Sequence, residues 1–333
     1  MSIRSLILGS AVIGLAAPAL ADVTVYTTRQ PDLITPVMEA FTAETGIAVN
    51  LNFVDDGLVE RLKAEGRRSP ADLVMTVDIA NLQRVVDAGV LQPVDNDVLT
   101  SAIPAELRSP DNLWFGLTTR ARIVYASRDR VADGEITTYE DLASDNWEGR
   151  ICTRSGLHNY NLALLSAMIE HHGQEAAREW AAGIKANLAR TPQGNDRAQV
   201  KAIWAGECDI SLGNTYYMGQ MLSDEEQTEW ANSVRILFPK FENGGTHVNV
   251  SGVAMTQSAP NRDEAIQLLE FLVSPKAQSI YAEENFEYPV TDAPVSATVA
   301  DWGSFTGDDT SLSAIAAQRP NALRIMEEVD FDG

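Results

Sequence analysis

Two adjacent tyrosines, Tyr216 and Tyr217, stand between glycines in a chain that contains only eight tyrosines. On a β-strand, successive side chains point to opposite faces, so the two rings could not meet one target. Neighbours inside a helix also diverge, because contact there requires a spacing of three or four residues. In a loop or in the first turn of a helix, both phenol oxygens can be aimed at one point. Such a pair suits a hard, highly charged cation, and the simpler alternative is two amphipathic rings in an ordinary pocket wall.

Further polar side chains occur at junctions between predicted elements. Arg29 and Gln30 lie where the first predicted strand meets the first helix, and free N–H groups and the helix dipole favour an anion there. Tyr160 precedes another helix, and Tyr216 follows a strand. Open α/β sheets place ligands at the carboxyl ends of strands. The pattern predicts three phenol oxygens facing an anion-binding arginine. For Tyr160 the alternative is a half-buried ring that caps a helix.

Strand and helix patterns alternate along the chain, which predicts an α/β fold. The predicted strands cover residues 22–27, 47–53, 72–77, 114–117, 122–126, 150–152, 209–212, 234–238 and 250–255. The predicted helices cover residues 31–41, 58–64, 79–88, 139–142, 161–171, 174–187, 196–205, 262–272, 275–285 and 312–329, the last broken before Pro320. We expect two lobes joined by crossing strands, with a ligand cleft between them, because pockets favour domain interfaces.

The N-terminus has the features of a sorting signal. Arg4 supplies a positive charge, residues 6–15 form a short apolar run, and Ala19-Leu20-Ala21 is a small-x-small cleavage site. Residues 1–21 are therefore predicted to be a cleaved signal peptide. No cysteine follows the cut to carry a lipid anchor, and the apolar run is too short for a membrane span. We expect an exported, periplasmic protein that is not inserted in the membrane.

The formal net charge of −22 excludes some partners. A surface that neutralises phosphates is not available, so we expect no nucleic-acid partner. The acidic surface could favour cations, but a solubilising role explains the charge more simply.

Cys152 and Cys208 are the only cysteines, and in an exported chain such a pair indicates one disulfide. The alternative is a nucleophilic Cys152 with His158 as its base, but an oxidised pair has no thiolate. The chain contains no Gly-rich phosphate loop, HExxH, GxSxG or paired-cysteine zinc motif. The His171-His172 pair is predicted to lie at a solvated helix end. We expect a binding protein and not an enzyme.

Six segments together resemble the periplasmic ferric-iron-binding proteins, the substrate-binding subunits of ferric ABC transporters in the bacterial transferrin-like group. They are Tyr26–Pro31, Thr76–Asp78, Gly116–Arg122, Asn159–Asn161, Asn214–Tyr217 and Gly245–Gly252. The resemblance covers nearly the whole mature chain and implies the type II two-lobed fold of periplasmic binding proteins. The expected N-terminal lobe comprises residues 22–121 and about 247–296, and the expected C-terminal lobe comprises residues 122–246 and about 297–333.

In this family, the residues that match Tyr160, Tyr216 and Tyr217 bind Fe³⁺ as phenolates. Many members place a histidine directly after the arginine that matches Arg29, whereas this chain has Gln30. With glutamine at this position, the chain resembles a subgroup of the family that binds iron together with a synergistic carbonate. The resemblance therefore implies that Arg29 and Gln30 hold the carbonate anion.

Three more residues match family positions near the site. They are Asp78, Arg120 and Asn214, of which Arg120 is expected to supply a positive charge behind the ligands. Fe³⁺ is a hard cation, so phenolates and carbonate suit it better than thiolates do. A free tyrosine has a pKa near 10, and the charge of the metal must therefore drive deprotonation.

The resemblance also implies a partner, the permease of an inner-membrane ABC transporter, to which a monomeric protein delivers ferric iron. The competing hypothesis is a carrier of the same fold for an organic cation, such as a polyamine- or thiamine-like solute. In that case the tyrosines would be stacking platforms.

Overall fold

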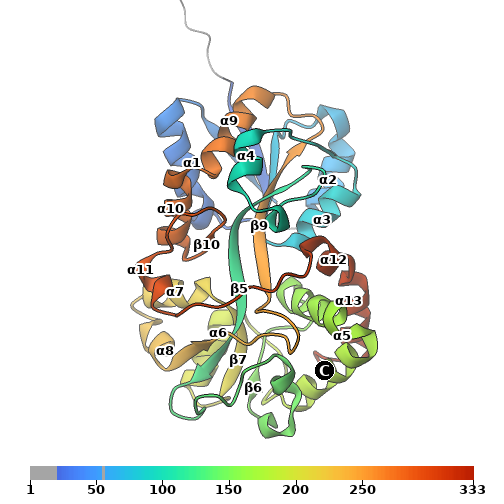
Figure 1. Ribbon diagram of the computed structural model, residues 1–333, viewed down its shortest axis with the longest axis vertical. Coiled ribbons are helices and arrows are strands. Elements are labelled where there is room, and N and C mark those ends of the chain that lie inside the picture. Colours follow the sequence, from blue (N-terminus) through green and yellow to red (C-terminus); the bar gives the residue numbers. More distant parts are fainter. Residues whose placement is uncertain (1–20, 55–56) are drawn as a thin grey trace, which may run out of the picture.

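The computed structural model describes residues 21–54 and 57–333, which form two α/β lobes stacked along the long axis of the molecule (Figure 1). The predicted signal peptide lies outside the described residues, apart from Ala21. No helix in the described part of the chain is long and apolar enough to cross a membrane.

The upper lobe in Figure 1 has three parallel strands at its centre, with β1 between β2 and β3. Proline at the start of α1 fixes the first helical turn, and Ile34, Val37 and Phe41 bury one face of the helix. Gly46 ends α1 with φ +77°, a conformation that glycine adopts at low cost. The elements of this lobe are β1 (Val23–Thr27), α1 (Pro31–Thr45), β2 (Val49–Phe53), α2 (Leu58–Glu65), β3 (Leu73–Thr76), α3 (Ile79–Asp87), β4 (Leu91–Gln92), α4 (Asp97–Ala102), α9 (Arg262–Leu272), α10 (Pro275–Asn285) and β10 (Tyr288–Pro289).

Two long strands, β5 (Phe115–Ser127) and β9 (Val248–Thr256), run between the lobes as an antiparallel pair. The sequence patterns predicted separate strands at 114–117 and 122–126, and this was wrong, because β5 is continuous. The polar residues between the two apolar runs are buried in the strand and do not interrupt it. One sheet therefore spans the molecule in the order β2-β1-β3-β9-β5-β7-β6, in which β6 (Ile151–Cys152) and β7 (Ile210–Asn214) belong to the lower lobe. The predicted lobe boundary at 121/122 falls inside β5, and its position stays a prediction.

The lower lobe is built around β7, which pairs with β5 and β6. The helices predicted at 161–171 and 174–187 form the two arms of α5, which meet at Gly173 with φ +82°. The elements of this lobe are β6 (Ile151–Cys152), α5 (Asn159–Ala186), α6 (Asp196–Trp204), β7 (Ile210–Asn214), α7 (Tyr216–Leu222), α8 (Thr228–Asn232) and β8 (Val234–Leu237). Short 3-10 turns occupy residues 66–68, 105–107, 140–143 and 145–147.

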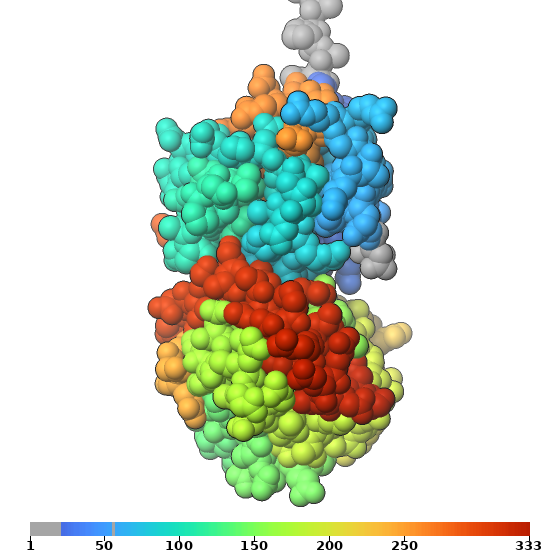
Figure 2. Space-filling view, turned by 90° about the vertical axis from the view of Figure 1, so that its right-hand side faces the viewer, coloured from blue at the N-terminus to red at the C-terminus, as the bar shows by residue number. Residues whose placement is uncertain are grey.

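The C-terminal segment lies across the junction of the lobes, where Figure 2 shows it in red between the blue-to-cyan and green surfaces. It contains α11 (Ala297–Ala300), α12 (Leu312–Ala317) and α13 (Arg319–Glu328), so the predicted break before Pro320 is confirmed. Leu312 packs with side chains of the upper lobe, whereas Ile315 packs with side chains of the lower lobe. The segment therefore contacts both lobes.

The predicted disulfide between Cys152 and Cys208 is confirmed, with a Cα–Cα distance of 5.9 Å. It joins β6 to the turn that leads into β7, the strand that precedes the tyrosine pair. Closing a loop of this length stabilises the fold by about 4 kcal/mol on the chain-entropy model. The alternative of a nucleophilic Cys152 is wrong, because both sulfurs are in the disulfide.

Candidate metal and anion site

Tyr216 and Tyr217 occupy the first turn of α7, directly beyond the carboxyl end of β7. Their ring centroids lie 4.3 Å apart, and the two residues are only 7% and 8% exposed. Tyr160, in the first turn of α5, brings its phenol oxygen to 3.1 Å from that of Tyr216. Two helix starts in the lower lobe therefore gather three phenols, as the first-turn interpretation of the pair predicts.

These phenols line a cavity of about 80 Å³, which we call the tyrosine cavity. The upper lobe closes this cavity with the junction of β1 and α1 and with Val77, which follows β3. The long strand β5 contributes Arg120. The lining residues are Thr28, Arg29, Gln30, Leu33, Val77, Arg120, Tyr160, Tyr216 and Tyr217. The structure thus brings together six of the residues predicted from the sequence, from both lobes.

Arg29 is already paired within the protein. Its guanidinium donates to both carboxylate oxygens of Glu287, at 3.0 and 2.6 Å, and to the Ser251 hydroxyl at 2.5 Å. Burial alone would lower the pKa of Arg29, but the Glu287 carboxylate raises it above its usual value. The charge of Arg29 is therefore matched, while its Nε hydrogen has no acceptor among the described residues.

Arg120 provides a less compensated charge. It is 2% exposed and donates to the Ser251 hydroxyl at 3.1 Å, and its Nε also lacks an acceptor among the described residues. Among the described residues, no carboxylate lies within 4.0 Å of the Arg120 guanidinium in an ion pair. Arg120 lines the tyrosine cavity, and its role as a source of positive charge for the ligands stays a prediction.

Asp78 and Asn214, which were also predicted near the site, do not line the tyrosine cavity. Asp78 caps α3, accepting from the backbone and side-chain nitrogens of Asn81 at 2.8 and 2.9 Å, and its burial raises its pKa. Asn214 accepts from Arg122 at 3.1 Å and positions the end of β7. Both residues support the elements that carry the cavity.

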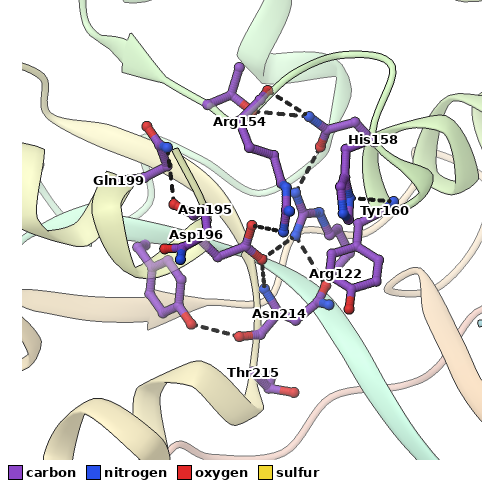
Figure 3. A network of polar contacts seen from close by, with 12 residues as sticks. Arg122, Arg154, His158, Tyr160, Asn195, Asp196, Gln199, Asn214 and Thr215 are labelled. Atoms are coloured by element: carbon purple, nitrogen blue, oxygen red, sulfur yellow. Dashed lines mark hydrogen bonds and ion pairs between the residues drawn. The ribbon is translucent and has the colours of Figure 1, made fainter. Parts of the chain in front are cut away.

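A buried cluster of two arginines and one aspartate lies behind Tyr160 (Figure 3). Asp196 accepts from Arg122 at 2.7 Å and from Arg154 at 3.1 Å. The guanidinium carbons of these arginines lie 5.8 and 5.1 Å from the Tyr160 ring centroid, within range of a cation–π interaction. The cluster carries a formal charge of about +1, because one carboxylate faces two guanidinium groups.

Burial and the neighbouring phenols raise the pKa values of Tyr216 and Tyr217 and keep both protonated in the absence of a cation. The pKa of Tyr216 is raised well above its usual value, first by burial and then by the neighbouring phenols of Tyr160 and Tyr217. Burial also raises the pKa of Tyr217. A cation that binds these oxygens must therefore displace their protons.

None of the histidines joins the three phenols around the tyrosine cavity. His158 caps α5 and contacts the Tyr160 ring edge-on, and burial lowers its pKa to about 4. The prediction of a solvated helix end is confirmed only in part: the pair ends the first arm of α5, but His171 bonds to Asp308 at 3.0 Å and stacks on Phe241, and the half-buried His172 bonds to Glu140 at 2.6 Å. Among the described residues, no three His, Cys, Asp or Glu side chains gather as a metal site.

Sequence patterns missed several residues that position the site. Glu287, Ser251, Arg154 and Asp196 all come from segments distant from their partners along the chain. Asp196 appears in the sequence as an ordinary acidic residue in the first turn of a helix. Glu287 follows the end of α10 and has no local signal at all.

A close contact between the lobes lies beside the tyrosine pair. A methyl group added to Gly219, in α7, would meet the Phe286 ring at 2.1 Å. Phe286 adopts φ +56° directly before Glu287, the partner of Arg29. The absence of a side chain at Gly219 therefore lets the ring pack against α7.

Taken together, two lobes joined by crossing strands, with a small polar cavity between them, define a periplasmic binding protein of the two-lobed type, as expected. The chain belongs to the family described as bacterial extracellular solute-binding protein, whose sequence profile matches residues 68–306.

Several similar proteins are named for iron or are described as bound to it. Iron uptake protein A1 of Synechocystis is 44% identical over 93% of this chain and 87% of its own length. The apo ferric ion-binding protein A of Pasteurella haemolytica superposes with a TM-score of 0.90 and 48% identity, covering 94% of this chain and 98% of that one. A Trichodesmium protein (IdiA, FutA) in complex with iron and citrate ligands has a TM-score of 0.88 and 42% identity, covering 93% of this chain and 99% of that one. The predicted resemblance to ferric-iron-binding proteins is confirmed.

Gly219→Ala should lower the free energy of unfolding by about 1–3 kcal/mol, because the new methyl group overpacks the contact with Phe286. Alanine has a more favourable helix propensity than glycine by about 1 kcal/mol, which stabilises the variant. The cost of overpacking must exceed this gain for the free energy of unfolding to fall. Urea unfolding of Gly219→Ala, Phe286→Ala and the double variant measures the coupling. In the Phe286→Ala background the cost should disappear. A stabilised Gly219→Ala single variant would contradict the contact.

Proposed function

We propose that this protein captures ferric iron in the periplasm, holding it with the phenolates of Tyr160, Tyr216 and Tyr217 and a synergistic carbonate. The observation that carries the proposal is the convergence of three phenols in one buried cavity of about 80 Å³. Phenolate oxygens are suitable ligands for a hard trivalent cation. Relatives named for ferric iron support the same choice of cargo.

The size of the tyrosine cavity disfavours the organic-cation alternative. Sites for organic ligands usually enclose about 300–1,000 Å³. The tyrosine cavity is several times smaller, and it suits a metal ion with a small anion. A polyamine- or thiamine-like solute would require the lobes to separate around it.

Charge balance favours a dianion beside the metal. Ferric iron and three phenolates cancel formally, so carbonate leaves two negative charges in a buried site. Arg120 supplies one compensating charge, and the Arg122–Asp196–Arg154 cluster supplies the other. Because Glu287 already neutralises Arg29, we propose that Arg29 and Gln30 orient the carbonate by hydrogen bonds, while the compensating charge comes from Arg120 and the cluster.

The protein would then act as the substrate-binding subunit of an ABC transporter. It would travel as a monomer in the periplasm, after removal of residues 1–21, and deliver its iron to the inner-membrane permease. This role requires binding and release but no catalysis, in keeping with relatives that are named for iron uptake and binding.

Adding Fe³⁺ and bicarbonate to the iron-free protein should produce a visible phenolate-to-iron charge-transfer band. Tyr160→Phe, Tyr216→Phe and Tyr217→Phe should each weaken or abolish it, because each removes one oxygen ligand. Tyr288→Phe is a matched control, since Tyr288 lies outside the tyrosine cavity. A colourless, iron-free wild-type protein after this treatment would rule out the proposal.

The hydrogen-bonding role of Arg29 can be separated from its charge. Arg29→Gln alone would leave Glu287 buried and unpaired, so the charge-neutral pair Arg29→Gln/Glu287→Gln is the cleaner test. Losing charge-assisted hydrogen bonds costs about 1.5–3 kcal/mol, so iron retention in bicarbonate should fall roughly 10- to 150-fold. Retention without bicarbonate should change little. Equal losses in both buffers would mean that Arg29 is structural.

Iron affinity should fall steeply with acidification. The pKa values of Tyr216 and Tyr217 are raised, so these phenols hold their protons between pH 5 and 8 in the iron-free protein, and binding as phenolates must release them. Together with the proton of Tyr160, the third proposed ligand, three displaced protons predict about a thousandfold loss of affinity per pH unit. Proton release on adding ferric nitrilotriacetate can be counted in a pH-stat. The triple Tyr→Phe variant provides the baseline, and release of fewer than two protons would contradict a three-phenolate site.

A further inference from the structure

A cavity of about 890 Å³ lies on the opposite face of β5 and β9 from the tyrosine cavity. Thr119 lines this cavity and Arg120 lines the tyrosine cavity, and successive residues of a strand point to opposite faces. Residues 295–312, which carry α11 and lead to α12 across β5 in Figure 1, form much of the wall. We call these residues the strap and the space the strap cavity. Its volume is typical of sites for organic ligands, which enclose about 300–1,000 Å³.

Both lobes contribute to the strap cavity. Leu107 packs with the core of the upper lobe, and Tyr288 of β10 pairs with Thr119. From the strap, Phe305 stacks on Phe238, which follows β8 in the lower lobe, with ring centroids 4.8 Å apart. Tyr288 meets Phe305 edge-on at 5.3 Å. An aromatic contact between the lobes therefore forms part of the wall, and a ligand seated there contacts both lobes.

The charged side chains around the strap cavity are all acidic. Glu106, Asp308 and Asp309 line it, and no lysine, arginine or histidine does so among the described residues. Asp308 already bonds to His171 at 3.0 Å, whereas Glu106 and Asp309 form no ion pair within the described ranges. The Tyr288 hydroxyl is buried and has no partner in the described part of the chain. Apolar walls, aromatic rings and free carboxylates together suit an organic cation.

We propose that the strap cavity binds a small organic cation with an apolar body, and that this binding favours closure of the cleft around iron. Separation of the lobes at the tyrosine cavity bends β5 and β9 and narrows the space on their other face. A ligand that fills the strap cavity resists this narrowing, so it binds the closed form more tightly than the open form. The coupling to iron rests on the proposed function, whereas the binding of the cation does not.

Equilibrium dialysis of the mature, iron-free protein against three matched indoles tests the site. Tryptamine carries an ammonium group, tryptophol has a hydroxyl in its place, and indole-3-acetate has a carboxylate. Tryptamine should bind at least about tenfold more tightly than tryptophol, because its ammonium reaches the free carboxylates, and indole-3-acetate should bind most weakly. Glu106→Gln/Asp309→Asn should reduce the preference for tryptamine over tryptophol to about twofold or less, because it removes those carboxylates.

Asp292→Asn/Asp301→Asn is the matched control. Both aspartates are exposed and lie outside the strap cavity, and the variant removes the same number of charges. It should therefore keep the preference of the wild-type protein. Equal or undetectable binding of tryptamine and tryptophol to the wild-type protein would overturn the inference, as would a preference that survives Glu106→Gln/Asp309→Asn.

Iron supplied with bicarbonate tests the coupling. Saturating tryptamine should strengthen the retention of iron against a competing chelator by about fivefold or more, and iron should tighten tryptamine binding by the same factor, because coupling between sites is reciprocal. Unchanged retention would overturn the coupling. Competition between tryptamine and iron would overturn the whole inference, because it would place the cation in the tyrosine cavity. A wild-type protein that binds tryptamine with the expected preference but binds no iron from bicarbonate would refute the proposed function while supporting the cation site.

Discussion

Buried charge between the lobes is the constraint on which the arrangement of this molecule depends. A guanidinium removed from water is costly unless a carboxylate and further hydrogen bonds compensate it. Glu287 does this for Arg29, and Asp196 does it for Arg122 and Arg154. Each pair joins residues far apart in the sequence, so satisfying the charges also fixes the junction of β1 and α1 and the starts of α5 and α6. The tyrosines are held between these two ion-pair groups.

The long strand β5 links the two groups. Alternate residues of a strand share a face, so Arg120 and Arg122 project from the same side, one toward the tyrosine cavity and one toward Asp196. Both are almost fully buried in a strand that belongs to both lobes. A bend of β5 during lobe motion would therefore shift positive charge relative to the phenols. The strand that connects the lobes therefore also carries part of the positive charge around the site.

Sequence patterns predicted most helices and strands and the disulfide from local signals, and together with the family resemblance they predicted six of the residues that line the tyrosine cavity. Tyr216 and Tyr217 follow a strand, and Arg29 follows another, so topology alone brings them to one cleft. The continuity of β5 was missed because buried arginines resemble a solvated break. Glu287 and Asp196 were missed because an acidic residue becomes an ion-pair partner only through tertiary contacts, which no local pattern encodes. The solvated interpretation of His171 failed for the same reason.

Under the proposed function, the division of ligands between the lobes has a mechanical consequence. All three phenols belong to the lower lobe, on α5 and α7, whereas Arg29 and Gln30 belong to the upper lobe. Iron can therefore bind to one lobe before the cleft closes, and the upper lobe then adds the groups that hold the anion. Opening the cleft would remove the anion contacts first and leave iron on phenolates that burial no longer shields from protons. Protonation by water that reaches the open site would then complete release, because an ordinary phenol has a pKa near 10.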